Sequence, residues 1–132
     1  MPYLFAFRTT NFDASKESPN PINPIAGESV LIWLRSVLVE AQYQVTEVAP
    51  EDFGWYVEVH GAGASYMVVA SSDAQVSDSE SAWIVQIRKN SSLSEKVLGK
   101  GQLTADDPLV GVVERTLRCA NGIRNIEVSS NV

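Results

Sequence analysis

The sequence predicts an α+β fold, a two-layer sandwich in which two helices cover one face of a mostly antiparallel sheet. Residues 30–41 and 109–120 carry apolar side chains at helical spacing, whereas residues 55–60 and 83–88 alternate apolar and polar side chains, as half-buried strands do. The links between successive predicted strands are too short for parallel crossovers, so the strands are expected to run antiparallel.

The chain starts with a predicted strand at Tyr3–Arg8, which is rich in aromatic residues. An arm is predicted over residues 9–27, because this segment holds Asn-Pro-Ile twice, at 20–22 and 23–25. Each proline fixes φ and keeps the preceding asparagine out of the helical region. The arm is therefore expected to be extended or turning.

The first helix is predicted from about Ser29 to about Gln42, because Gly27 and Ser29 suit a helix start. Ile32 and Val39 fall on the polar side of this helix, where the arm or a partner would cover them, and we favour the arm. The other apolar side chains gather on one wide face. They are Val30, Leu31, Trp33, Leu34, Val37, Leu38 and Ala41.

The sheet is predicted to continue after this helix. The predicted strands lie at 44–48, 55–60, 65–71 and 83–88. Ala49-Pro50 is expected to end the first of them, and the glycines in residues 61–63 permit a reversal between the second and the third. Residues 72–81 are rich in serine and aspartate and are predicted to form a mobile polar loop.

Two further helix starts lie in the last third of the chain. Ser92–Glu95 fits a capping box, but glycines at 99 and 101 would end such a helix within about two turns. Asp107-Pro108 is a clearer start, with an acidic N-cap and a proline at the first helical position. Asn121-Gly122 suits the end of this helix, and Ile123–Val128 is predicted to add an edge strand.

Composition excludes several classes of protein. The length of 132 residues suits a single domain over 1–132, and one cysteine and one histidine cannot build a disulfide framework or a Cys/His zinc site. A lone cysteine fits a reducing compartment, so a cytoplasmic location is predicted. Scattered basic residues and a net charge of −6 disfavour nucleic-acid binding. The longest apolar stretch, Val30–Leu34, is far short of the roughly 20 residues that span a membrane.

No catalytic residue, cofactor or metal ligand is predicted. The run His60–Gly63 is similar to the oxyanion loop of lipases and esterases, but the Gly-x-Ser-x-Gly elbow and a second histidine are missing. Cys119 and His60 would form a nucleophile pair, yet His60 is expected on the sheet face away from the helices. Cys119 is expected to be a small buried core residue. Gly99-Lys100-Gly101 lacks the rest of a phosphate-binding loop.

The first binding candidate is the acidic turn formed by Glu51 and Asp52. Phe53, Trp55 and Tyr56 crowd beside it, and paired carboxylates bind divalent cations or serve acid–base chemistry. The plainer interpretation is a turn that leads into a strand, with the aromatic residues in the core.

The second candidate is the sheet face that the predicted helices leave open. It is expected to carry Tyr56, Glu58, His60, Gln86 and Arg88. Glu58 and Arg88 are expected to pair across strands. Tyrosine and arginine are favoured at interfaces, so this face is a candidate for a protein partner or for a second copy of the chain.

Three stretches together resemble a set of small bacterial proteins of unassigned function. They are Asn-Pro-Ile-Asn-Pro-Ile-x-Gly at 20–27, Glu-Asp-Phe-Gly-Trp-Tyr at 51–56 and Trp-Ile-Val-Gln-Ile-Arg-Lys at 83–89. The resemblance covers roughly Asn20 to Asp107. It implies a bacterial single-domain protein and carries no activity, cofactor or catalytic residue. It directs attention to Asn23, Glu51, Asp52, Gly54, Trp55 and Lys89.

The favoured hypothesis is a small cytoplasmic interaction module of the inhibitor or immunity type. The alternative is a carboxylate-dependent or metal-assisted hydrolase centred on Glu51 and Asp52, which requires a concave site that holds both acids. A homodimer through the open sheet face is the third hypothesis. The candidate binding residues are Asn23, Glu51, Asp52, Trp55, Tyr56, Glu58, His60, Arg88 and Lys89.

Overall fold

The computed structural model describes residues 3–13, 16–23, 25–61, 63–72, 81–90 and 103–129. Within these residues, two helices and a seven-stranded antiparallel sheet confirm the predicted α+β class. The strands are β1 (Tyr3–Thr9), β2 (Gln44–Val45), β3 (Ala49–Glu51), β4 (Gly54–Gly61), β5 (Ala64–Ser72), β6 (Ser81–Asn90) and β7 (Ile123–Ser129). The helices are α1 (Glu28–Glu40) and α3 (Pro108–Cys119).

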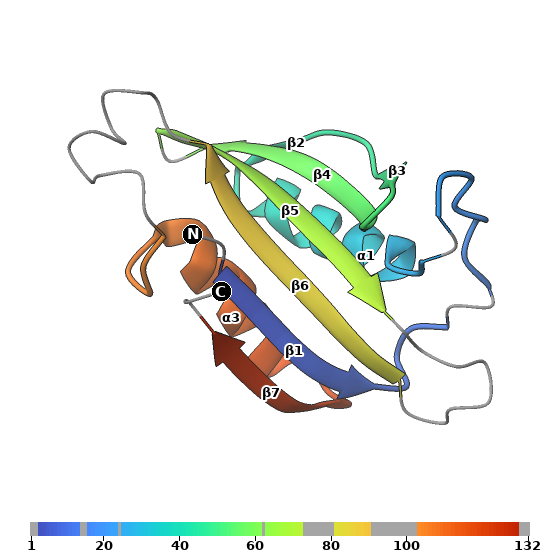
Figure 1. The fold of residues 1–132 in the computed structure, drawn as a ribbon. Helices are drawn as coiled ribbons and strands as arrows, with labels where there is room; N and C mark the ends of the chain where they lie inside the picture. Colours follow the sequence, from blue (N-terminus) through green and yellow to red (C-terminus); the bar gives the residue numbers. More distant parts are fainter. Residues whose placement is uncertain are drawn as a thin grey trace.

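The strands lie in the order β2-β4-β5-β6-β1-β7, and β3 pairs with the first half of β4 (Figure 1). The predicted antiparallel meander of β4, β5 and β6 is confirmed, as is the predicted edge strand β7. β1 lies between β6 and β7 although it comes first in the chain. β5 therefore lies near the middle of the sheet, with β4 on one side and β6 on the other.

One face of the sheet, the inner face, packs against both helices. Figure 1 shows α1 behind β4 and β5, and α3 behind β1 and β7. Because successive side chains on a strand point to opposite faces, alternate residues of each long strand reach this core. Those buried here with residues of both helices include Phe5, Phe7, Val57, Val59, Tyr66, Val68, Trp83, Val85 and Ile87. The opposite face is the outer face.

The start of α3 is the one that the sequence predicts. Asp107 is the N-cap, and its carboxylate accepts the N–H of Leu109 at 2.9 Å. Pro108 occupies the first helical position, where its missing N–H costs nothing. The capping carboxylate also suits the positive end of the helix.

The start of α1 is capped by a distant residue. The N-cap, Gly27, has no side chain, and the carboxylate of Glu17 in the arm takes its place. This carboxylate accepts the backbone N–H groups of Gly27, Glu28 and Ser29 at 3.0, 3.1 and 2.9 Å, and also the Ser29 hydroxyl. Charge-assisted hydrogen bonds of this kind are stronger than neutral ones, so Glu17 fixes the arm to α1.

The arm does not cover Ile32 and Val39, contrary to the sequence prediction. Their exposed fractions are 56% and 47%. Glu17 ties the arm to the N-terminus of α1, away from the side on which these residues lie. Cys119 is exposed rather than buried, because it follows the buried Leu117 by two positions, which is more than half a helical turn.

Ala49-Pro50 does not end strand pairing, contrary to prediction. Both residues belong to β3, where Pro50 lies opposite Trp55 of β4. β3 has one strand neighbour, and a proline is tolerated in such an edge position because it has no N–H to offer to a second strand.

Two predictions fall outside the described residues. Residues 73–80 of the predicted loop at 72–81 are not described, and its end residues Ser72 and Ser81 belong to β5 and β6. The possible short helix at Ser92–Glu95 and the Gly99-Lys100-Gly101 sequence are also outside. In the described part of the chain, no helix has the length and apolar character needed to cross a membrane.

Candidate functional site

The two Asn-Pro-Ile sequences hold the arm against the turn between β3 and β4. The side-chain amide of Asn20 donates to the carbonyls of Glu51 and Gly54 at 3.1 and 2.8 Å. The amide of Asn23 donates to the carbonyl of Asp52 at 2.8 Å. The Asn20 oxygen in turn accepts the N–H groups of Ile22 and Asn23. Both asparagine side chains are therefore used to fix the arm to this turn.

The arm also packs tightly against β5 and β4. The Trp55 indole N–H donates to the carbonyl of Ile25 at 3.1 Å, and Trp55 is buried. A Cβ atom on Gly27 or Gly54 would lie 2.2 or 2.5 Å from the carbonyl oxygen of Ala70. The first two stretches of the bacterial resemblance thus meet in one structural assembly, in which Asn23 and Trp55 have structural contacts.

The acidic turn does not assemble a metal site. The Glu51 carboxylate accepts the N–H of Asp52 at 3.0 Å, within the turn itself. In the described ranges, no group of three or more His, Cys, Asp or Glu side chains lies close enough to hold a metal ion. Neither acid lines the hollow described below. Nothing in this geometry favours the hydrolase hypothesis.

Lys89 belongs to a polar cluster at the inner face. Its Nζ lies 3.3 Å from the Asp107 carboxylate and 5.9 Å from the centre of the Tyr66 ring. The Tyr66 hydroxyl donates to the same carboxylate at 2.9 Å. Burial and this hydrogen bond raise the pKa of Tyr66, and burial with the Asp107 charge raises the pKa of Tyr43. Lys89 therefore supports the start of α3, and its side chain lies far from the outer face.

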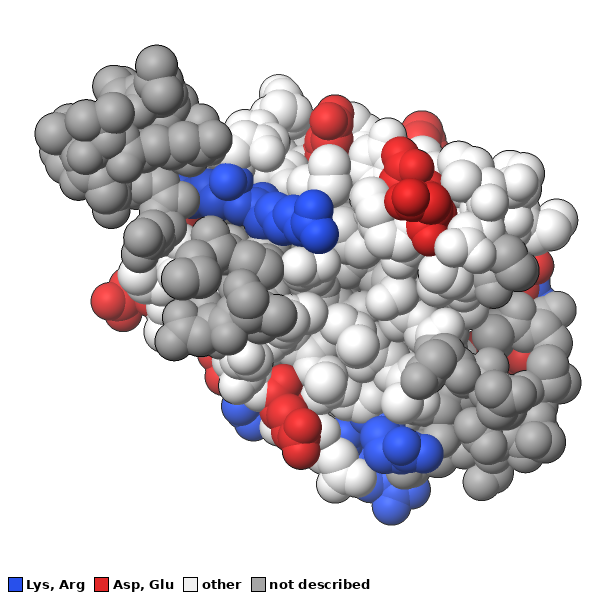
Figure 2. All heavy atoms as spheres, viewed as in Figure 1, with Lys and Arg blue, Asp and Glu red and all other residues white. Residues whose placement is uncertain are grey.

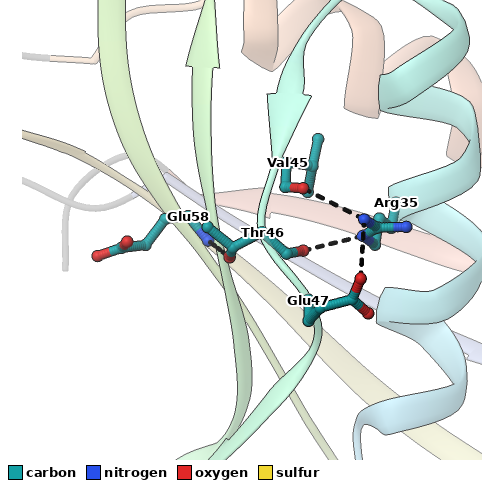
Figure 3. Close-up of polar contacts among 5 residues, drawn as sticks. All are labelled: Arg35, Val45, Thr46, Glu47 and Glu58. Carbon is teal, nitrogen blue, oxygen red and sulfur yellow. Dashed lines mark hydrogen bonds and ion pairs between the residues drawn. The ribbon is translucent and has the colours of Figure 1, made fainter.

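Arg35 joins α1 to the segment between β2 and β3 (Figure 3). Its guanidinium donates to the carbonyls of Thr46 and Val45 at 2.9 and 3.4 Å and lies 3.4 Å from the Glu47 carboxylate. The Thr46 hydroxyl accepts the backbone N–H of Glu58 at 2.8 Å. In Figure 3 the Glu58 side chain points away from Arg35. The contact joins residues 10 to 12 positions apart, and no sequence pattern indicates it.

The outer face carries the remaining candidates. Strand register aligns Tyr56, Val69 and Gln86 in one row across β4, β5 and β6. The next row holds Glu58, Met67 and Arg88, and the third holds His60, Ser65 and Asn90. The expected pairing of Glu58 with Arg88 is wrong, because β5 separates their strands. The Arg88 guanidinium lies over the Phe53 ring instead, 5.8 Å from its centre.

Phe53 also belongs to this face, whereas the sequence indicated it only as an aromatic neighbour of the acidic turn. Its ring contacts that of Tyr56 on β4, with 6.3 Å between centres, and approaches Arg88 on β6. Val69 lies between these strands and is 4% exposed, although it is not part of the core beneath the helices. The Phe53 ring contacts Tyr56 in the row of Val69 and Arg88 in the next row, so it is the side chain best placed to cover Val69. The available signal was a large apolar residue in a polar turn.

A broad hollow of about 1240 Å³ lies at one end of the outer face. Its lining includes Ala6, Arg8, Phe53, Ser71 and Ile84, together with residues 17–20 of the arm. Figure 2 shows that the middle of this face is uncharged, with basic and acidic side chains toward its margins. Ile84 is 43% exposed here. The hollow thus combines apolar and polar groups on a face that no described helix covers.

Comparison of the chain with protein-family models, with curated proteins and with solved structures finds no match. The resemblance to small bacterial proteins therefore stays a prediction. The functional argument depends on the geometry of this chain alone.

Proposed function

We propose that this protein is a small interaction module, of the inhibitor or immunity type, that binds a protein partner through its outer sheet face. The observation that carries the proposal is the pair of apolar side chains Phe53 and Ile84, which line the hollow on a face without a covering helix in the described residues. A soluble sheet face without a partner is normally solvated and polar. Apolar groups on such a face mark an interaction surface.

The chemistry of this face matches a protein interface in composition. At its centre, the Phe53 ring contacts Tyr56 on one side and the Arg88 guanidinium on the other, and aromatic residues and arginine are the usual anchors of binding energy. Apart from the Arg88 guanidinium over Phe53, the charged side chains lie toward the margins, as in the polar rim of an interface (Figure 2). We place the module in the cytoplasm, because a chain with one cysteine suits a reducing compartment.

The alternative, a hydrolase centred on Glu51 and Asp52, has no supporting observation in the described residues. The Glu51 carboxylate is used inside its own turn. The candidates Asn23, Trp55 and Lys89 all have contacts that hold the fold. These assignments leave the outer face as the surface with the best support.

The experiment compares two exposed isoleucines. Ile84→Arg places a charge on the outer face, and Ile32→Arg places the same charge on the polar side of α1, where Ile32 is at least as exposed. Each tagged variant is used to capture partners from a lysate of the source organism, after circular dichroism has verified folding. We expect wild type and Ile32→Arg to retain the same partner, and Ile84→Arg to lose it. Equal capture by both variants would contradict the proposal.

A further inference from the structure

We propose that the occupant of the outer face is a second copy of this chain, related by a two-fold axis that runs along β5. This inference depends on the proposed function, because it assigns the partner of the same surface. Its starting point is the strand register. β5 has β4 on one side and β6 on the other, and the three rows across these strands carry chemically complementary ends.

The complementarity is clearest in the row through Met67. Glu58 lies on one side of Met67 and Arg88 lies on the other, and both side chains are exposed. Within one chain, two strand spacings of about 4.8 Å separate their backbones. The backbones of Glu58 and Arg88 therefore lie on opposite sides of β5, at similar distances from it.

A two-fold axis in the plane of contact brings opposite charges of the two copies together. When two sheets stack face to face about an axis along β5, each β4 lies over the β6 of the other copy. Glu58 then meets Arg88 of the second copy, and the symmetry repeats this contact. The same operation sets Tyr56 against Gln86 and His60 against Asn90, which are pairs able to hydrogen-bond.

The centre of this contact is apolar. Val69 and Met67 lie on β5 itself, and the Phe53 ring lies between Tyr56 of β4 and Arg88 of β6. The axis therefore brings the two Phe53 rings close to each other, over the two Val69 side chains. Stacked sheets with strands in similar directions are a common packing of β structure, and the charged pairs that flank the axis fix their register.

The available area is sufficient for such a dimer. Strand spacing and rise per residue give the outer face a size of roughly 25 Å by 25 Å. Two stacked copies would bury about 1200 Å² in total, which reaches the lower end of stable protein interfaces. A complex of this size is expected to dissociate on dilution. Its dissociation constant can therefore be measured, and charge variants can test which residues face each other.

The test is a charge exchange in the full chain. Glu58→Arg alone brings two arginines together at each of the two symmetric contacts, and Arg88→Glu alone brings two glutamates together. Each single variant is expected to weaken dimerisation by about tenfold or more. The double variant Glu58→Arg/Arg88→Glu restores opposite charges between the copies, and it is expected to recover most of the lost affinity.

Sedimentation equilibrium over a wide range of protein concentration measures the dissociation constant of each variant, and circular dichroism verifies folding. The matched control is Glu114→Arg/Arg118→Glu with its two single variants. This pair forms an ion pair on the exposed side of α3, 3.0 Å apart. None of the three control variants is expected to change dimerisation.

Two results would overturn the second copy as the occupant. One is a wild-type chain that stays monomeric up to near-millimolar concentration. The other is a dimer whose dissociation constant does not respond to Glu58→Arg, or does not recover in the folded double variant. Neither result decides the proposed function, which fails separately if capture of a different protein is insensitive to Ile84→Arg.

Discussion

The two faces of the sheet are made by the same strands and differ in what covers them. The inner face buries Phe5, Val57 and Val85 completely beneath α1 and α3. The outer face has the Phe53 ring as a partial cover and leaves Ile84 exposed. Packing explains the inner residues, because a sheet needs a dry face to fold. Packing within the chain does not explain the exposed Ile84, which belongs to the proposed binding surface.

The neighbours Arg88 and Lys89 show the same difference in their charges. Lys89 points to the inner side, where its ammonium group pairs with the buried Asp107. Arg88 points to the outer side, where its guanidinium lies over Phe53 and contacts the Gln86 side chain at 3.4 Å. One cation stabilises a helix start inside the fold, and the other is presented on the surface. The predictions below test this division between the faces.

The largest effect is expected for Trp83→Ala compared with its neighbour Ile84→Ala. Trp83 is buried at the inner face against Phe12, with 5.8 Å between ring centres. Removing it should cost about 3–5 kcal/mol of unfolding free energy, because a large cavity remains. Ile84→Ala, on the outer face, should cost less than about 1 kcal/mol. Urea denaturation of both variants measures the difference.

Similar costs for the two variants would contradict the division between the faces. A loss below about 1 kcal/mol for a folded Trp83→Ala would mean that the tryptophan does not support the core. A loss of several kcal/mol for Ile84→Ala would mean that the outer face is packed within the same molecule, and that it is not a docking surface.

An intermediate effect is expected for Gly54→Ala, at the place where the chain turns toward the outer face. Gly54 has a φ of 133°, and an added Cβ would lie 2.5 Å from the Ala70 carbonyl oxygen. Backbone strain at such a position costs about 1–3 kcal/mol. The control is Gly111→Ala in α3, where no atom lies within 4 Å of an added Cβ.

Gly111→Ala should leave the protein as stable or raise its stability by up to about 1 kcal/mol, since alanine favours a helix. The midpoint of thermal unfolding should therefore fall for Gly54→Ala and stay or rise for Gly111→Ala. A harmless Gly54→Ala would show that the turn between β3 and β4 can move away from β5. It would also remove the structural reason for the position of Phe53.

The sequence predicted the inner face better than any other part of the molecule. Burial on one side imposes a period of two on strands such as 55–60 and a period of 3.6 on helices, so these elements are visible in the order of residues. Asp107-Pro108 was equally informative, because capping is a local interaction. The ends of these elements, the role of Pro50, the exposure of Cys119 and the cluster around Asp107 needed the structure.

The arm was less predictable, because its contacts join distant positions. Asn20 bonds to carbonyls 31 and 34 residues away, and Glu17 caps a helix that starts 11 residues later. Such contacts leave no periodic signal. A polar residue in a distinctive motif therefore suggested binding at Asn23 and Glu51, where the structure has hydrogen bonds within the fold.

The outer face was predicted in composition but not in arrangement. Alternation correctly assigned Tyr56, Glu58 and Arg88 to it, since strand parity needs no knowledge of strand order. The sequence could not show that β5 separates Glu58 from Arg88. Nor could it place Phe53, because alternation is lost within a turn.

The smallest effect on the free energy of unfolding is expected for Tyr66→Phe compared with Tyr56→Phe. This effect depends on the ionisation of the Tyr66 hydroxyl. Tyr66 lies at the inner face, where its hydroxyl donates to Asp107, and Lys89 and Tyr43 belong to the same cluster. Loss of this hydrogen bond should cost about 1 kcal/mol at neutral pH. Tyr56 lies on the outer face, and its variant should cost less.

The pH dependence separates the two tyrosines further. The fold raises the pKa of Tyr66 above its ordinary value of 10.0, because burial and the bond to Asp107 both disfavour the phenolate. The contribution of Tyr66 to stability is therefore complete below pH 10 and is lost as the pH rises above that value, where the unfolded chain ionises first. The wild type should lose stability in this range by up to about 1.4 kcal/mol per pH unit from this group.

Urea denaturation between neutral pH and pH 11 tests this expectation. Tyr66→Phe should make the alkaline decline shallower, with the raised pKa of Tyr43 supplying the part that remains. Tyr56→Phe should leave the decline as it is in the wild type, because the Asp107 cluster is intact. An unchanged decline in Tyr66→Phe would mean that the inner-face cluster does not hold its tyrosine neutral. A shallower decline in Tyr56→Phe would place an alkaline-sensitive contact on the outer face, and the two faces would no longer differ in this respect.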